Sequence, residues 1–332
     1  MQTIRHLTHL VRFPAMVLAL LVLTCGTPSR AWSGSEKLWI ANDDGYGIES
    51  FSSKQLKKSG TPTPLQLLTY PEVTGLAFDK SRNLWVVIPP DEVVQFTAAQ
   101  LKNLKNEQSP TPGVTITSTT FVYVYGCNFD HQGNLWLADY SNGSIDELSK
   151  TQLAAGSGAV TPAVVVKFSH PNGPNFVTFD KAGNAWVDGE NDDTVGAFSP
   201  SQLTSGGDQS ATVMLADDGS GTSLSSPGEI AFDKKGNLWV PNYSSATVVK
   251  YAKNQLSGIS DPAPAVKLSS AIFDGPWGAA FDSQGDLVIL NYTDATIAKF
   301  TPQHLKTSGA PVPEVSVMDG LYGYQIIFGP SS

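Results

Sequence analysis

The residues of this chain most able to bind a metal ion are aspartates that recur in the pattern Asp-x-x-Gly-Asn. They stand in the segments Asp130 to Asn134, Asp180 to Asn184 and Asp233 to Asn237. A calcium loop of the EF-hand kind needs acids at alternate positions and a distant Glu, and that spacing is absent. An Asp that accepts backbone N–H bonds, with a Gly that allows positive φ, is what a short hairpin needs. We therefore expect these aspartates to be structural.

Cysteine and histidine, which often catalyse reactions or bind metals, are few in this sequence. Cys127 is the only cysteine after the first 31 residues, so the rest of the chain cannot form an internal disulfide. It lies on an apolar strand, where a buried thiol without a nucleophilic role is expected. His170 stands alone in a loop, which is typical of a solvated histidine.

The aspartate turns belong to a repeat of about 50 residues. Each copy joins an apolar strand that ends in Phe-Asp to a second strand that carries Trp. The copies run from Phe78 to Trp85, Phe129 to Trp136, Phe179 to Trp186, Phe232 to Trp239 and Phe281 to Val288. The phenylalanines lie 51, 50, 53 and 49 residues apart. This period, filled with short strands, is typical of one propeller blade per repeat.

The two ends of the repeat region complement each other. Leu38-Trp39-Ile40 reads as a second strand without a first, and Gln325-Ile326-Ile327-Phe328 reads as a first strand without a second. The sequence therefore predicts an all-β fold, a six-bladed β-propeller over residues 35–329 in a single domain. We expect four-stranded antiparallel blades, with the C-terminal strand entering the first blade and closing the ring.

A Gln-Leu pair follows the third strand of most copies, as in Gln152-Leu153, and His304-Leu305 takes its place in the last. A feature shared by all blades is scaffold rather than site. We interpret it as a capped turn whose Leu packs beneath the blade.

Residues 1–31 have the pattern of a secretory signal peptide. Arg5 and Arg12 precede an apolar run at residues 16–23, and Ser29-Arg30-Ala31 offers small residues for cleavage. The run is too short for a membrane span. We expect a secreted or periplasmic protein, and a lipid anchor on Cys25 is the less favoured alternative.

The charge of the chain argues against polyanionic partners. The formal net charge is −9, from 21 basic and 30 acidic residues. Removing the predicted signal takes away three arginines and no acid, which leaves 18 basic and 30 acidic residues and a net charge of −12. Nucleic acids and anionic membranes bind clustered Lys and Arg, so we expect neither as a partner. We expect a monomer.

The repeat resembles those of NHL-repeat propellers and of the related gluconolactonase-like and virginiamycin-B-lyase-like proteins. The shared pattern is an apolar strand ending in Phe-Asp, then Gly-Asn, then an apolar strand ending in Asp or Asn, and it covers nearly all of residues 35–329. The resemblance implies that loops before the first strands, and loops between the second and third strands, form one mouth where ligands bind.

The resemblance also implies that the position four residues before each inner Phe faces the central channel at this mouth. These residues are Thr74, Tyr125, Asn175, Gly228, Trp277 and Tyr324. They differ between blades, and variation at equivalent positions is where a symmetric ring becomes a particular site. Trp277 has no counterpart in the other blades, so we expect its ring to offer a ligand a rigid apolar face.

A second set lies three positions after each strand Trp. It includes Asp139, Asn242 and Asn291, which could either cap a turn or contact a ligand. Glu229 lies one residue away from the channel position. The candidate ligand-binding residues are therefore Thr74, Tyr125, Asp139, Asn175, Glu229, Asn242, Trp277, Asn291 and Tyr324.

The leading hypothesis is an exported, non-catalytic propeller that binds a small polar molecule, a sugar or a peptide through an aromatic and amide-rich mouth, without metal or cofactor. The alternative is a metal-dependent lactonase, hydrolase or lyase that uses Asn175, Glu229, Asp139 and Asp188. Only Asn175 matches the metal ligands that the gluconolactonase-like resemblance implies, and only His170 could supply the histidine of a lyase. Assembly through the Pro-rich loops of the other face is a third hypothesis.

Overall fold

The computed structural model describes residues 36–42, 47–70, 72–104, 109–221, 223–318, 320 and 322–330. The predicted signal peptide and Cys25 lie outside these ranges. Within them, no helix has the length and apolar character needed to cross a membrane.

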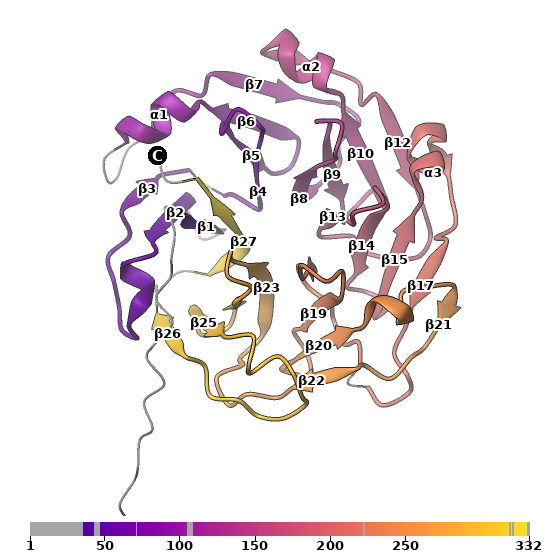
Figure 1. Ribbon diagram of the computed structural model, residues 1–332. Helices are drawn as coiled ribbons and strands as arrows, with labels where there is room; N and C mark the ends of the chain where they lie inside the picture. The colour runs from indigo at the N-terminus through magenta and orange to yellow at the C-terminus, as the bar shows by residue number, and fades with distance from the viewer. Residues whose placement is uncertain are drawn as a thin grey trace, which may run out of the picture. The chain divides into compact units, whose positions relative to one another are not determined.

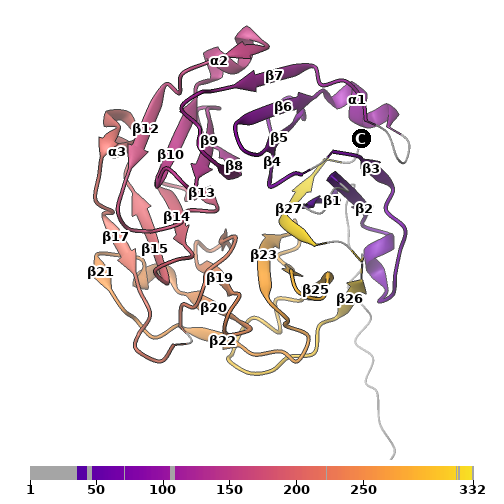
Figure 2. The same cartoon turned by 180° about the vertical axis from the view of Figure 1, so that it is seen from behind.

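Six β-sheets form a ring of blades (Figure 1; Figure 2). From the inner to the outer strand, blade 1 contains β27 (Gly323–Gly329), β1 (Lys37–Asn42), β2 (Gly47–Ser52) and β3 (Gln66–Leu68), and blade 2 contains β4 (Gly75–Phe78), β5 (Leu84–Ile88), β6 (Glu92–Phe96) and β7 (Val114–Thr117). Blade 3 contains β8 (Val124–Phe129), β9 (Leu135–Asp139), β10 (Ser144–Leu148) and β12 (Val164–Lys167), and blade 4 contains β13 (Val177–Phe179), β14 (Ala185–Gly189), β15 (Thr194–Phe198) and β17 (Val213–Leu215). Blade 5 contains β18 (Ala231–Phe232), β19 (Leu238–Asn242), β20 (Thr247–Tyr251) and β22 (Val266–Leu268), and blade 6 contains β23 (Pro276–Phe281), β24 (Leu287–Asn291), β25 (Thr296–Phe300) and β26 (Val315–Met318).

The prediction of an all-β, six-bladed propeller is confirmed. Blade 1 combines the two ends of the described chain, because β27 pairs antiparallel with β1 from Lys37↔Gly329 to Asn42↔Gly323. In Figure 1 the yellow β27 accordingly lies beside the indigo strands β1 and β2.

The expectation of purely antiparallel, four-stranded blades needs a correction. Blades 2, 3 and 4 carry a fifth strand of two residues, β11 (Gly158–Ala159), β16 (Gly207–Asp208) and β21 (Ile259–Ser260). Each comes from the segment between the third and fourth strands of the next blade and pairs parallel with the outer strand. At two further junctions the pairing is a single parallel bridge. Gly60 of blade 1 pairs with Val317 of blade 6, and Gly309 of blade 6 pairs with Leu268 of blade 5. We name these five segments the straps.

The repeated aspartate joins each hairpin turn to the tryptophan of the second strand. In blade 3, Oδ1 of Asp130 accepts three backbone N–H bonds of the turn, at 2.8–2.9 Å. Its Oδ2 accepts bonds from Asn134 Nδ2 at 2.8 Å and from Trp136 Nε1 at 3.1 Å. In blade 1, Gly329 replaces the aspartate, and Trp39 Nε1 has no hydrogen-bond partner among the described residues. The structural interpretation of the aspartates is confirmed.

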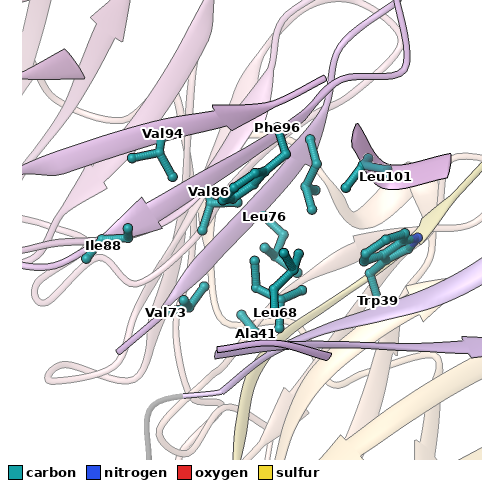
Figure 3. Packing of buried hydrophobic residues seen from close by; sticks show 12 residues of the cluster. Trp39, Ala41, Leu68, Val73, Leu76, Val86, Ile88, Val94, Phe96 and Leu101 are labelled. Atoms are coloured by element: carbon teal, nitrogen blue, oxygen red, sulfur yellow. The ribbon is translucent and has the colours of Figure 1, made fainter. Parts of the chain in front are cut away.

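The strand tryptophans pack between blades. Trp39 of blade 1 meets the ring of Phe78 in blade 2 edge to face at 5.7 Å, and Trp186 meets Phe232 in the same way at 5.6 Å. Figure 3 shows Trp39 in a shared core with Leu76 and Phe96 of blade 2. Burial of such large rings is a main source of stability in the ring.

Four Gln-Leu pairs lie on short helices that follow the third strands, Gln255 ends a fifth short helix, and His304-Leu305 lies in a turn. The α-helices are α1 (Ala98–Asn103), α2 (Lys150–Ala155) and α3 (Pro200–Ser205), and the 3-10 helices are η1 (Gln55–Lys57) and η2 (Lys253–Gln255). In α2, Ser149 accepts the Gln152 N–H, and Gln152 Oε1 accepts the Ser149 N–H. Leu153 is buried under the blade. The capped-turn interpretation is confirmed.

Candidate functional site

Two kinds of loop meet on one face of the ring, which we name the mouth. Loops that enter the inner strands lie beside loops that join second and third strands. The Tyr140 N–H donates to the Tyr123 carbonyl at 3.0 Å, and the Tyr292 N–H donates to the Gly275 carbonyl at 2.8 Å. The aspartate hairpins and short helices lie at the other ends of the strands, on what we name the hairpin face.

Eight aromatic residues gather at the mouth, and we name them the aromatic cluster. They are Tyr123, Tyr125, Tyr140, Tyr243, Trp277, Tyr292, Tyr322 and Tyr324. Their ring centroids form a connected network with neighbour distances of 5.2–6.3 Å. Most pairs are tilted or edge to face, which is a favourable geometry for aromatic rings. Tyr243 and Tyr322 are 36% and 44% exposed, so the cluster also offers surface to a partner.

Rings from non-adjacent blades meet within this cluster. Tyr125 of blade 3 and Tyr324 of blade 1 lie 5.5 Å apart, although blade 2 stands between them. The equivalent position in blade 2 is the small Thr74. In blade 5 it is Gly228, where an added Cβ would lie 2.4 Å from the Trp277 carbonyl oxygen. Gly228 therefore allows the backbone of blade 6 to approach closely, while Thr74 contacts the backbone of blade 3.

Trp277 is only 4% exposed, and this burial corrects the expectation that its ring offers a free face. It packs against Tyr243 at 5.8 Å, Phe176 at 6.1 Å and Tyr324 at 6.2 Å. The sequence shows that Trp277 is not part of the repeat. It does not show that three rings from other blades cover this side chain. Trp277 is therefore the buried member of the aromatic cluster, and the rings of Tyr243 and Tyr324 pack against it.

Tyr125 lies at the centre of the cluster and contacts Tyr123, Tyr140 and Tyr324. Burial raises the pKa of its phenol, and nearby Tyr140, Glu190 and Glu72 raise that pKa further, while a hydrogen bond with Tyr324 opposes the shift. The phenol is therefore a neutral hydrogen-bonding group at physiological pH.

Sequence reasoning missed Tyr123 and Tyr322, although a signal was present. Each stands two residues before a channel position, in Tyr123-Val-Tyr125 and Tyr322-Gly-Tyr324. It also missed Glu72, whose Oε1 accepts a 2.8 Å hydrogen bond from the Tyr123 hydroxyl.

Thr74, Asp139, Asn242 and Asn291 have no exposed surface, which corrects their assignment as ligand contacts. Asp139 accepts the N–H groups of Val122 and Tyr123 at 2.9 and 3.1 Å. Asn291 Nδ2 donates to the Ile272 carbonyl at 2.8 Å, and Asn242 Nδ2 donates to the Ser223 carbonyl at 3.3 Å. These three side chains hold the mouth loops in place, which is the capping alternative. Thr74 Oγ1 donates to backbone carbonyls of blade 3.

Asn175 lies in a buried polar group within blade 4. Its Nδ2 donates to Asp188 Oδ2 at 3.3 Å and to Glu190 Oε2 at 3.1 Å. Asp188 Oδ1 accepts the Phe176 N–H at 2.6 Å, and burial raises the pKa of the Asp188 carboxyl well above its usual value. Only Glu190 of this group reaches the mouth surface in part.

Glu229 lies deeper than the mouth, on the wall of a cavity of about 420 Å³ lined by the inner strands. Its Oε2 accepts the Ala279 N–H at 3.3 Å and the Ile326 N–H at 3.1 Å. Gln325, on the same wall, accepts the Leu76 N–H at 2.5 Å. These side chains satisfy backbone N–H groups at the unpaired inner edges of blades 6, 1 and 2. Glu229, which precedes β18 of blade 5, therefore connects that blade to blades 6 and 1.

Burial raises the pKa of the Glu229 carboxyl to about 8, against the lowering effect of its hydrogen bonds with Ile326, Gln325 and Ala279. Burial also raises the pKa of the Cys127 thiol. Cys127 packs in an apolar core with Leu135 and Leu137, as the sequence predicts for a thiol without a nucleophilic role.

Of the four residues proposed for a metal-dependent enzyme, only Asn175 and Asp188 are in direct contact. Asp139 and Glu229 accept backbone N–H bonds in different parts of the ring, and Asn175 turns its amide nitrogen toward two carboxylates. Hard cations need several oxygen ligands around one point. Within the described ranges, no group of three or more His, Cys, Asp or Glu residues is placed to hold a metal ion. The arrangement does not fit the metal site that the gluconolactonase-like resemblance implies.

His170 is 63% exposed in the loop before β13, on the mouth side. Its Nδ1 lies 2.5 Å from Asp192 Oδ2, and Asp192 Oδ1 also accepts the Asn172 N–H at 3.0 Å. The sequence placed this histidine on the correct face but did not show its carboxylate partner.

No protein-family model matches the chain, and no curated protein matches it in sequence. Solved structures share its fold. A streptogramin B lyase superposes with a TM-score of 0.50 at 15% identity, covering 83% of this chain and 72% of the lyase.

Two further structures superpose more closely. A Bacteroides fragilis protein provisionally assigned as a 6-phosphogluconolactonase has a TM-score of 0.60 at 14% identity, covering 89% of this chain and 98% of that chain. A chain of a nidogen–laminin complex has a TM-score of 0.58 at 15% identity, covering 90% of this chain and 99% of that chain. At these identities the likeness shows the fold alone, and one fold hosts many functions. The chain is a six-bladed β-propeller that is similar in fold to these structures.

Proposed function

We propose that this chain is an exported, non-catalytic propeller that binds its ligand through the aromatic cluster. The observation that carries the proposal is the connected network of eight rings at the mouth, two of which are more than a third exposed. Exposed aromatic residues that are held rigidly by their neighbours are typical binding anchors, because little side-chain entropy is lost when they are covered.

The chemistry of the polar candidates supports the same proposal. Asp139, Asn242 and Asn291 hold backbone groups of the mouth loops, and Glu229 holds the inner strands. A side chain that serves as a fixed cap is poorly placed to transfer protons to a substrate. Tyr243 and Tyr322, in contrast, have accessible ring surface.

The proposal is tested with a paired set of surface variants. Short peptides and oligosaccharides are screened for binding to the wild type, and the hits are titrated against Tyr243→Ala/Tyr322→Ala. We expect affinity to fall by about 1–3 kcal/mol, because exposed aromatic anchors contribute that much. Ile259→Ala/Val312→Ala removes two apolar side chains that are 79% and 80% exposed outside the cluster, and serves as the control. Equal affinities of both variants for every hit would reject the aromatic cluster as the binding surface.

Export is the second part of the proposal and rests on the signal-like pattern of residues 1–31. We expect the protein recovered from outside the bacterial cytoplasm to begin near Trp32, as mass spectrometry would show. A mature chain that begins at Cys25 and carries lipid would establish the anchored alternative instead.

A lyase or lactonase function is a second candidate, favoured by one observation. His170 and Asp192 form an exposed hydrogen-bonded pair at the mouth, and such a pair can act as a general base. Incubation with a cyclic depsipeptide lactone and a sugar lactone, followed by mass spectrometry, tests it. Turnover that is lost in His170→Asn would replace the non-catalytic proposal.

A further inference from the structure

Basic residues are distributed unevenly between the two faces of the ring. The described mouth loops carry half-exposed or exposed acids and no lysine or arginine. These acids are Glu72, Asp91, Glu190, Asp192, Asp193, Asp217, Asp218, Asp274 and Asp294. They come from the loops of blades 2, 4, 5 and 6, so acids lie on several sides of the aromatic cluster.

Most of the basic residues lie at the opposite ends of the strands; exposed Lys167, at the end of β12 beside the Asn142 and Gly143 loop, is an exception. The hairpin turns and the short helical segments of the hairpin face carry Lys54, Lys57, Lys58, Lys80, Arg82, Lys102, Lys150, Lys181, Lys234, Lys235, Lys253 and Lys306. A surface with charge of one sign attracts ligands of the opposite sign and raises their association rate. The acids of the mouth loops therefore attract cations to this face by electrostatics.

Acids and rings are in direct contact at the mouth. Glu72 accepts a hydrogen bond from the Tyr123 hydroxyl at 2.8 Å, and Glu72 and Glu190 are both close enough to Tyr125 to raise the pKa of its phenol. A carboxylate beside an aromatic face binds an ammonium or guanidinium group through an ion pair and a cation–π contact at once. Neutral sugars would use only the rings.

The shape of the surface indicates an extended ligand. The inner-strand cavity is lined by residues below the cluster, and Tyr125, Trp277 and Tyr324 do not line it. Exposed apolar side chains at Val122, Tyr243 and Tyr322 instead spread over loops of blades 3, 5 and 1. A polypeptide ligand with several cationic side chains can contact acids in several loops, whereas a single small cation can contact the acids of only one loop.

We propose that the mouth docks a basic polypeptide segment, whose lysine or arginine side chains lie on the tyrosine rings and pair with Glu72, Glu190 and Asp274. This inference rests on the proposed binding role of the same surface and adds the chemical class of the partner.

The test uses fluorescence anisotropy with a labelled short peptide of alternating lysine and glycine. The same peptide with every lysine acetylated is the neutral probe. We expect the lysine peptide to bind at least about tenfold more tightly than the acetylated one at low salt, with the difference shrinking as salt is added. In Glu190→Gln/Asp274→Asn, binding of the lysine peptide should weaken by about threefold to tenfold.

The matched control is Asp208→Asn/Asp261→Asn, which removes two exposed acids from the strap segments at the outer edge of the ring. Equal weakening in both double variants would show unspecific attraction and overturn the inference. Equal binding of the two peptides, with loss in Tyr243→Ala/Tyr322→Ala, would overturn the cationic partner but keep the aromatic site. Tighter binding of a glucosamine oligomer or of spermine would overturn the polypeptide assignment. Failure of both peptides to bind would also overturn it, while the screen of peptides and oligosaccharides decides the binding role separately.

Discussion

Single residues at the mouth differ in whether they serve the fold or a ligand, and burial separates the two roles. Trp277 is 4% exposed and touches three rings, whereas Tyr322 is 44% exposed and touches Tyr292. Removing the first ring would leave a cavity, while removing the second would uncover little. Aromatic residues of one cluster can thus contribute either to stability or to recognition.

We expect Trp277→Ala to lower the free energy of unfolding by about 3–5 kcal/mol, because the ring is buried and its cavity cannot fully collapse. Tyr322→Ala should change it by less than about 1 kcal/mol, as is usual for a surface substitution. Urea unfolding followed by tryptophan fluorescence measures both. A Trp277→Ala protein as stable as the wild type would mean that the ring is not packed as described.

The pH dependence of stability should reflect Glu229. Burial raises the pKa of its carboxyl to about 8 in the folded protein, and burial raises the pKa of Asp146 to about 7. For an acid with a raised folded pKa, the stabilising contribution is complete below the unfolded pKa and is lost as pH rises through the folded pKa. We therefore expect the melting temperature to fall between about pH 5 and pH 9.

Glu229→Gln isolates this contribution, since the amide keeps an oxygen acceptor but cannot ionise. The variant should gain stability relative to the wild type as the pH rises, in melting curves recorded over the same range. A constant difference between the two proteins at every pH would show that Glu229 does not titrate as inferred.

At the scale of the element, the hairpin turn and the second strand act as one unit. Asp180 accepts the Asn184 N–H at 3.0 Å, Asn184 Nδ2 at 2.7 Å and Trp186 Nε1 at 3.0 Å. Asp180→Ala would leave these donors without their acceptor, so we expect a loss of about 1–3 kcal/mol in unfolding free energy. Ligand affinity should not change, because the turn lies on the hairpin face. Weaker ligand binding with unchanged stability would assign this aspartate to a site.

The repeated elements could be predicted from the sequence, whereas the variable ones could not. A Phe-Asp turn or a Gln-Leu cap appears in nearly every blade, so its spacing reveals both its existence and its structural role. Three straps are two-residue strands and two are single bridges, all in segments rich in Gly, Pro and Ser, and so short a pairing has no periodic pattern. The exposure of Trp277 depends on rings from three other blades, which no local spacing encodes.

At the scale of the whole molecule, β27 provides the inner strand of blade 1. Deleting residues 321–332 would expose the inner edge of β1 and remove the Ile326 N–H that Glu229 binds. We expect this truncation to unfold or aggregate, because an unpaired strand edge invites association. Thermal unfolding and size-exclusion chromatography measure the outcome. A truncated protein that stays monomeric and melts like the full chain would contradict the importance of this strand.

The straps have a direction, and this direction bears on how the protein is made. Each strap reaches back to the blade before it, except that Gly60 of blade 1 reaches Val317 of blade 6. Blade 1 therefore needs residues from the end of the chain at its inner edge, through β27, and its Gly60 segment pairs with β26, the outer strand of blade 6. During synthesis β1 emerges early, and its inner edge stays unpaired until β27 has been made. The earliest part of the ring to be translated is thus the last to be stabilised.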